Sequence, residues 1–208
     1  MAPSRSGIAR TRNLCHLPDL EGSEQHGLLL LADISGYTRF VGTTGAAHSY
    51  RTVARLLELV LKRLEGILEL SNIEGDALLF HADDPTRMQE RGLPSFLGAT
   101  FHEFERETRF IAEGADCDAC AAVTQLSLKY VVHAGTYVKQ KVAGHTVLFG
   151  PDVILVHRLL KNTIPSQHYV FVTESALPYL ALGPTAVEHE ERTDLGPARG
   201  RYLTFRGW

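Results

Sequence analysis

The order of predicted elements in this 208-residue chain is that of an α+β fold, with a ferredoxin-like βαββαβ core and C-terminal strand additions. Three observations predict it. An apolar strand near the start is followed by a strongly amphipathic helix; a strand–turn–strand segment comes next; a second helix and a long strand complete the pattern. Hydrophobic residues make up 44% of the chain, which favours one sizeable core over bulk disorder.

The first half of the chain supplies the βαββ part. Residues 27–33 form a buried apolar strand, and the following "SGYTRF" is a glycine turn that leads into a helix. Residues 51–65 carry apolar side chains at helical spacing, and Gly66 stands where a helix C-cap is expected. Residues 67–82 predict two strands around a tight Glu-Gly-Asp turn.

We expect residues 1–24 to be a mobile leader and residues 25–208 to form a single domain.

The second half of the chain completes the core and adds strands to it. The predicted elements are, in order, a loop at 83–95, a helix at 95–113, a loop at 113–120, a long strand at 126–138, its hairpin partner at 139–149, a helix from Pro151 through Lys161, and late strands at 169–172 and 202–205.

Composition narrows the functional classes. The net charge is −3, from 21 basic and 24 acidic residues, which argues against a general nucleic-acid binder. The polar first 22 residues lack the apolar segment of a signal peptide, and no apolar run approaches the ~20 residues that span a bilayer. With only three cysteines, a cytoplasmic protein with reduced thiols and no membrane partner is the simplest interpretation.

Two aspartates are expected to meet at one end of the sheet. Asp33 ends the first strand and Asp76 begins the third, and these strands are antiparallel neighbours in the predicted topology. Two close carboxylates repel unless a cation or proton joins them, and oxygen ligands with room for phosphate suit Mg²⁺ or Mn²⁺. The alternative is that Asp33 caps the next helix and Asp76 only makes the turn. Topology alone leaves both interpretations open.

Four motifs resemble those of the class III nucleotide cyclases, the adenylate and guanylate cyclases. "LLLLADISGYTRF" resembles their first metal motif and "EGDALLF" their second, a Gly-Asp hairpin followed by a strand. "VVHAG" resembles the central strand, and "FGPDVILVHRLLKN" resembles the helix that carries a transition-state arginine. The motifs stand in the family's order and cover roughly residues 27–162. Together with "CDAC", they are closer still to an uncharacterised bacterial cyclase-like branch.

The resemblance implies a fold of the nucleotide-cyclase type and a two-metal site that binds a nucleoside triphosphate with Mg²⁺ or Mn²⁺. By motif match, Asp33, Asp76 and the backbone carbonyl of Ile34 would hold the metals. The phosphate-binding positions would be Ser35, Gly36, Tyr37 and Thr38 at the helix start and Arg199 or Arg201 near the C-terminus. Arg158 would be the catalytic arginine, supplied across a two-fold homodimer.

The base and ribose positions depart from the family. Asn72 and Val147 stand where the family reads the base, and Ile154 replaces the asparagine that holds the ribose. Three readings stay open: a cyclase with relaxed or unusual base choice that releases pyrophosphate, a site for another phosphate ligand, or a catalytically degenerate nucleotide-binding or dimerisation module. For ligand-free protein, removing one of two repelling carboxylates by Asp33→Asn is expected to be stabilising.

Other residues that could form a functional site have weaker support from the sequence. Cys117 and Cys120 form a lone C-x-x-C, which needs two more ligands for zinc. Cys15 with His16, or a second subunit, could supply them, but reduced surface thiols are the favoured reading. His133 lies mid-strand and is interpreted as a satisfied structural histidine.

Overall fold

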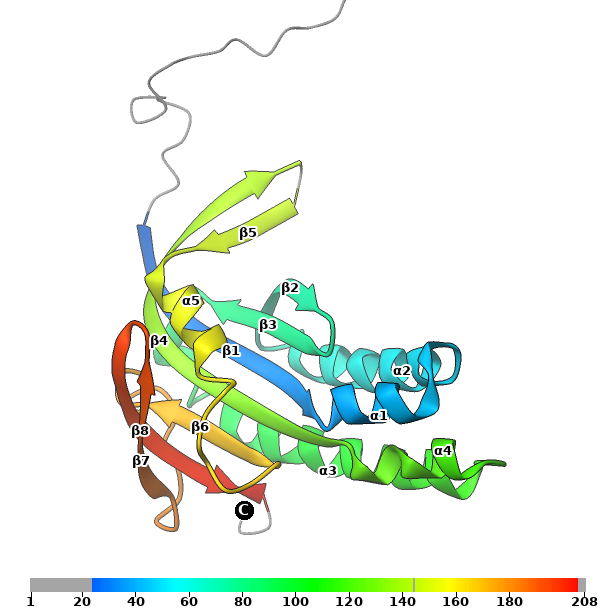
Figure 1. Cartoon of the computed structure of the whole chain (residues 1–208). Helices are drawn as coiled ribbons and strands as arrows, with labels where there is room; N and C mark the ends of the chain where they lie inside the picture. The colour runs from blue at the N-terminus through cyan, green and yellow to red at the C-terminus, as the bar shows by residue number, and fades with distance from the viewer. Residues whose placement is uncertain (1–23, 144, 206–208) are drawn as a thin grey trace, which may run out of the picture.

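The structure of the chain is a computed structural model that describes residues 24–143 and 145–205 (Figure 1). The strands are β1 (Glu24–Ser35), β2 (Glu69–Glu74), β3 (Ala77–Ala82), β4 (Ser127–Val142), β5 (His145–Phe149), β6 (Tyr169–Thr173), β7 (Val187–Thr193) and β8 (Gly196–Thr204). The α-helices are α1 (Tyr37–Thr44), α2 (Ala46–Leu64), α3 (Leu93–Glu113), α4 (Asp118–Ala121) and α5 (Pro151–Arg158), with 3₁₀ turns η3 (Pro85–Arg87) and η4 (Ala122–Gln125).

Within the described residues, the sheet runs in the order β2-β3-β1-β4-β6-β8-β7, and β5 pairs with β4 off this path. β1 is antiparallel to both β3 and β4, and β2 is antiparallel to β3. These four strands and their connecting helices are the predicted ferredoxin-like core. β6 then joins β4 in parallel, and β8 and β7 extend the sheet antiparallel. The predicted fold class, including its C-terminal strand additions, is confirmed.

Helices cover the middle of β1 from both sides, which explains its unbroken apolar run at residues 28–32. Leu28 and Leu30 pack in a cluster with residues of α2 and α3, whereas Leu29 and Leu31 pack in a second cluster with residues of α5. Figure 1 shows α2 and α3 on one side of the sheet and α5 on the other. A strand buried on both faces needs an apolar side chain at every position, so no polar alternation is present.

The helix α5 is shorter than the sequence predicted. It ends at Arg158, with Leu159 as its C-cap, rather than near Asn162, and the Asn162 side chain bonds back to that C-cap residue. Its amide donates to the carbonyl oxygen of Leu159 at 2.7 Å, and its Oδ1 accepts from the backbone N–H of Ile164 at 3.1 Å. Local side-chain bonds of this kind offer the backbone an alternative to helix, so the chain leaves α5 as a loop.

Four further boundary predictions need correction. Gly66 is not the left-handed cap of α2, since Glu65 ends the helix in a right-handed conformation and φ of Gly66 is not positive. Residues 139–142 continue β4, so only His145–Phe149 form its hairpin partner. The predicted loop at 113–120 contains the start of α4. β7 was not predicted.

The N-terminal prediction is mostly outside the described residues. The predicted leader covers residues 1–24, of which only Glu24 is described, and Glu24 is already the first residue of β1. Among the helices of the described part of the chain, we find none with the length and apolar character to cross a membrane.

Candidate functional site

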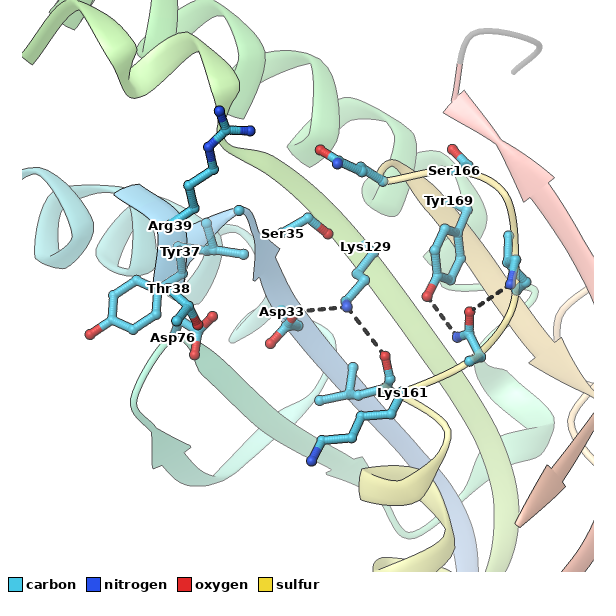
Figure 2. A pocket seen from close by; sticks show the side chains of 16 residues that line it. Asp33, Ser35, Tyr37, Thr38, Arg39, Asp76, Lys129, Lys161, Ser166 and Tyr169 are labelled. Carbon is cyan, nitrogen blue, oxygen red and sulfur yellow. Dashed lines mark hydrogen bonds and ion pairs between the residues drawn. The ribbon is translucent and has the colours of Figure 1, made fainter. Parts of the chain in front are cut away.

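Asp33 and Asp76 meet at one end of the sheet. β1 places Asp33 opposite Ala77, the first residue of β3, and the backbone N–H of Ile34 donates to the carbonyl oxygen of Asp76 at 3.2 Å. Gly75, with φ of 63°, lets the turn that joins β2 to β3 close tightly just before Asp76. Both aspartates line one cavity of about 570 Å³ (Figure 2). The carboxylates converge as the topology predicts, and their metal-binding role stays a prediction.

Lys129 neutralises only one of these carboxylates. It lies opposite Asp33 in the register of β4 with β1, and its Nζ is 3.1 Å from Asp33 Oδ2 and 3.3 Å from the carbonyl oxygen of Leu160. Burial, and secondarily the charge of Asp33, raise the pKa of Asp76 from 3.8 to about 6. Asp76 therefore lacks a counter-charge of its own among the described residues. Because Asp33 is ion-paired, the expectation that Asp33→Asn stabilises the ligand-free protein no longer holds.

Gly36 turns the chain from β1 into α1. Its φ of 88° is left-handed, and a Cβ there would lie 3.1 Å from the carbonyl oxygen of Gln125. Gly36 is the N-cap of α1 and no described side chain caps that helix, so the alternative role of Asp33 as a cap is wrong. The first N–H groups of α1 thus have no side-chain cap, and residues 35–38 and Arg39 line the cavity beside them.

The loop between α5 and β6 forms a second wall of the same cavity, which the sequence did not predict. Its lining residues are Leu160, Lys161, Asn162, Ile164, Ser166 and Gln167, with Tyr169 at the start of β6. The Asn162 amide donates to the Tyr169 hydroxyl at 2.7 Å. The buried carboxylate of Glu191 on β7 accepts from the backbone N–H and the hydroxyl of Thr163 at 2.7 and 2.9 Å. The bonds from Glu191 on β7 therefore hold this loop in place.

The predicted arginines lie elsewhere in the described chain. Arg158 is exposed at the end of α5, where its Nε is 3.1 Å from Asp194 Oδ1. Arg199 pairs with Glu190 at 2.6 Å. Arg201 donates to the carbonyl oxygen of Ala186 at 2.9 Å, and Arg199 and Arg201 both line a separate cavity of about 350 Å³ beside β7 and β8. None of the three lines the cavity that holds Asp33 and Asp76.

The three predicted base and ribose positions are also outside this cavity. The Asn72 amide donates to Glu74 Oε1 at 2.9 Å, and Asn72 Oδ1 accepts from the backbone N–H of Ile73 at 2.9 Å. Val147 lies on β5 opposite Gln140, and Ile154 is about half exposed on α5. Asn72 is thus satisfied within its own strand, and the other two positions offer only apolar surface.

Cys117 and Cys120 lie close together at the start of α4. The backbone N–H of Cys120 donates to the sulfur of Cys117 at 3.3 Å. The further zinc ligands considered, Cys15 and His16, lie outside the described residues. Within the described part, no group of three His, Cys, Asp or Glu side chains is arranged to hold a metal ion.

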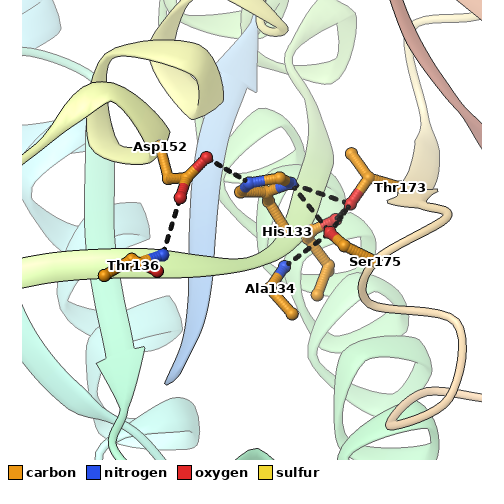
Figure 3. A network of polar contacts seen from close by, with 7 residues as sticks. His133, Ala134, Thr136, Asp152, Thr173 and Ser175 are labelled. Atoms are coloured by element: carbon orange, nitrogen blue, oxygen red, sulfur yellow. Dashed lines mark hydrogen bonds and ion pairs between the residues drawn. The ribbon is translucent and has the colours of Figure 1, made fainter. Parts of the chain in front are cut away.

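His133 is a satisfied structural histidine, as predicted (Figure 3). Its Nε2 is 3.1 Å from Asp152 Oδ1, and its Nδ1 is shared between the hydroxyls of Thr173 at 2.9 Å and Ser175 at 3.2 Å. The other oxygen of Asp152 accepts from the backbone N–H of Thr136 at 2.6 Å. The network links α5, β4 and the end of β6, and so it fixes α5 on the sheet.

A family comparison places the chain among its relatives. The profile of a family described as "Protein of unknown function (DUF2652)" matches residues 53–169, more than half of the 208 residues. The chain belongs to the DUF2652 family. The "Uncharacterized protein Rv2561/Rv2562" of Mycobacterium tuberculosis (strain ATCC 25618 / H37Rv) is 36% identical over 132 residues, a match that covers 59% of this chain. This DUF2652 chain spans 57% of the length of that relative.

Solved structures similar to the DUF2652 chain are adenylyl and guanylyl cyclases. A bacterial light-regulated adenylyl cyclase matches with a TM-score of 0.65 and 12% identity over 88% of this chain, which spans 52% of that chain. The adenylyl cyclase CyaB from P. aeruginosa gives 0.64 and 13%, covering 87% and 96% of the two chains. The guanylate cyclase domain of RhGC from Catenaria anguillulae, in complex with GTP, gives 0.58 and 14%, covering 88% and 98%. The resemblance to the class III cyclases is confirmed at the level of the fold.

Proposed function

We propose that this DUF2652 chain binds a nucleoside triphosphate together with Mg²⁺ or Mn²⁺ in the cavity of Asp33 and Asp76. The observation that carries the proposal is the convergence of two carboxylates in one cavity, of which, among the described residues, only Asp33 is ion-paired with a lysine. The cyclase-type fold supports it, because similar solved structures include one in complex with GTP.

The donor set fits a divalent cation. Carboxylate oxygens are the ligands that Mg²⁺ and Mn²⁺ prefer, and two of them leave coordination positions for phosphate oxygens. The raised pKa of Asp76 supports this fit, since a half-buried carboxylate beside another gains most from a nearby positive charge. When bound, the metal would neutralise phosphate charge and activate a ribose hydroxyl. Two carboxylates alone are a poor cage, so metal and triphosphate should bind together.

The chain's own groups would hold the phosphates. The uncapped N–H groups at the start of α1 favour an anion, with Gly36 allowing close approach of the backbone. Lys129 is within reach of the same cavity and would move from Asp33 toward a phosphate as metal takes over the carboxylate. Ser35 and Thr38 add hydroxyl donors to the lining.

A second copy of the chain would complete the site. Arg158 is outside the cavity, and its ion pair with Asp194 is exposed, so that pair holds it weakly. Apolar side chains are about half exposed on β2, β5 and α5, at Ile73, Phe149 and Ile154. A two-fold dimer that buries these residues would let Arg158 of one subunit approach Asp33 of the other.

Binding without efficient turnover is the function favoured over cyclisation. The positions by which class III cyclases read the base and hold the ribose are Asn72, Val147 and Ile154, of which one is internally bonded and two are apolar. If the attacking ribose hydroxyl is displaced by ~1 Å from its reactive position, the reaction can slow about 100-fold. Cyclic product, where formed, should therefore appear slowly and with little dependence on the base.

The proposal is tested by thermal unfolding with each of the four ribonucleoside triphosphates, with and without Mn²⁺. Saturation at about 100 times the dissociation constant adds about 2.7 kcal/mol, or about 5–10 °C for a domain of this size. We expect this shift only with metal and triphosphate together. Asp33→Asn should abolish it, and Asp116→Asn, a matched change at an exposed aspartate outside the cavity, should retain it.

Mass detection of cyclic nucleotide and pyrophosphate in the same samples separates turnover from binding. A wild-type protein that shows no shift with millimolar Mn²⁺ and any triphosphate would overturn the proposal and leave a dimerisation module as the better account. Light scattering at high micromolar concentration tests the dimer, and a monomer under those conditions contradicts that part.

A further inference from the structure

The cavity has cationic side chains on different sides of its two aspartates. Its lining includes the cationic residues Arg39, Lys129 and Lys161 together with Asp33 and Asp76. Figure 2 shows Arg39 beyond the helix start and Lys161 on the other side of Asp33, with Lys129 between them. A single phosphate group reaches donors only at hydrogen-bonding distance, about 3 Å. Charges spread in this way suit an extended anion with several phosphates.

Two of these cations have no ion pair in the described part of the chain. Among the described residues, the ion pair that lines the cavity joins Lys129 to Asp33, and neither Arg39 nor Lys161 has a carboxylate within 4.0 Å. Lys161 is exposed at the cavity wall, and Arg39 follows the residues at the start of α1. Cations that line a cavity without a carboxylate partner favour binding of an anion there.

In the loop wall after α5, most polar side chains that could read a base are engaged in bonds within the chain. In the loop wall, Asn162 bonds to Leu159, Ile164 and Tyr169, and the Ser166 hydroxyl bonds to the backbone of His168. The Gln167 amide is the remaining wall amide. An amide carries both donors and an acceptor, so Gln167 alone does not restrict the site to one base.

We infer that the site recognises a metal-bound chain of at least three phosphates and does not read the base. The inference rests on the proposed function and names its ligand class: linear condensed phosphates, with or without a nucleoside at one end. Inorganic tripolyphosphate should then bind as tightly as any nucleoside triphosphate. Lys161, from the loop after α5, is assigned as a phosphate contact from within the same chain.

Calorimetric titration of the full chain tests this inference. Inorganic tripolyphosphate, ATP, CTP and pyrophosphate are titrated at one fixed concentration of free Mn²⁺, since these ligands chelate the metal differently. We expect dissociation constants for tripolyphosphate, ATP and CTP within fivefold of one another, and pyrophosphate more than fivefold weaker. ATP binding more than fivefold tighter than tripolyphosphate or CTP would overturn the inference, as would pyrophosphate binding as tightly as tripolyphosphate.

The Lys161→Gln variant tests the loop wall, with Lys141→Gln as the matched control at an exposed lysine on β4. Loss of a charged contact should weaken tripolyphosphate and ATP by the same factor, about fivefold or more, and Lys141→Gln should leave both unchanged. An effect confined to ATP, or no effect, refutes the assignment of Lys161. If ATP binds and tripolyphosphate does not, the further inference fails and the proposed function stands; if neither binds with Mn²⁺, both fail.

Discussion

Replacing Asp76 by asparagine should make the ligand-free protein more stable. Burial and the charge of Asp33 raise the pKa of Asp76 from 3.8 to about 6. A rise of about 2 in pKa corresponds to about 3 kcal/mol at 1.36 kcal/mol per pKa unit. Because Asp76 is half-buried, solvent screening reduces this to about 1 kcal/mol. Asparagine also suits a turn after glycine, so the backbone is not expected to oppose the gain.

Asp33→Asn should have the opposite sign in the same assay. It leaves Lys129, whose side chain is only 18% exposed, without its carboxylate partner. We expect a loss of about 1–3 kcal/mol, between the values for exposed and buried pairs. Thermal unfolding at pH 7.5 without ligand should show the Asp76→Asn protein melting about 2–4 °C above wild type and the Asp33→Asn protein below it.

The pH dependence checks the cause of the gain. Above pH 6 the Asp76 carboxylate is charged in the folded protein, and its full penalty is present. As the pH falls from 6 to 4, the folded protein takes up a proton before the unfolded chain does, and the penalty disappears. The stability difference between Asp76→Asn and wild type should therefore vanish near pH 4. A gain that persists unchanged at pH 4, or a loss at pH 7.5 as large as that of Asp33→Asn, would refute the reasoning.

Three further predictions concern the framework of the site. Gly36→Ala should lower stability by about 1 kcal/mol or more and remove the metal–triphosphate shift, since φ is 88° and the added Cβ meets the turn before β4; an unchanged shift in thermal unfolding contradicts it. Gly135→Ala should lower the free energy of unfolding by about 1–3 kcal/mol, because its Cβ would overlap the Asp152 carboxylate. A decrease of less than about 0.5 kcal/mol in urea unfolding would contradict this prediction. Glu191→Gln should speed amide hydrogen exchange at Thr163 by weakening the two bonds that fix the cavity wall; unaltered exchange there would show that the wall is held otherwise.

The elements that the sequence predicts well are those with strong local signals. The middle of the strand β1, residues 28–32, is apolar at every position, and the β2–β3 hairpin has a Gly-Asp turn with Gly75 in the left-handed region, so both could be predicted from residue type alone. Their antiparallel pairing follows from the βαββαβ order, and it brings Asp33 and Asp76 together. This part of the site needed only topology.

The parts that could not be predicted depend on register and long-range contacts. Lys129 is one polar residue in a long strand, and only its pairing opposite Asp33 shows its importance. The wall after α5 has a helix-like sequence, but the helix ends at Arg158 and the Asn162 side chain bonds back to Leu159. β7 reads as "VEHEERT", a charged segment at the sheet edge, in which Glu191 is buried because it bonds to Thr163 far away in sequence.

The central claim is that Asp33 and Asp76 hold a divalent metal together with a triphosphate, and anomalous X-ray scattering from Mn²⁺ tests it most directly. Crystals grown with Mn²⁺ and a non-hydrolysable nucleoside triphosphate would be measured at the manganese edge. The account predicts an anomalous peak within coordination distance of both carboxylates and of phosphate oxygens, with Lys129 Nζ displaced from Asp33 Oδ2. Triphosphate bound with no manganese peak between Asp33 and Asp76, or a peak that survives in the Asp33→Asn protein, would contradict it.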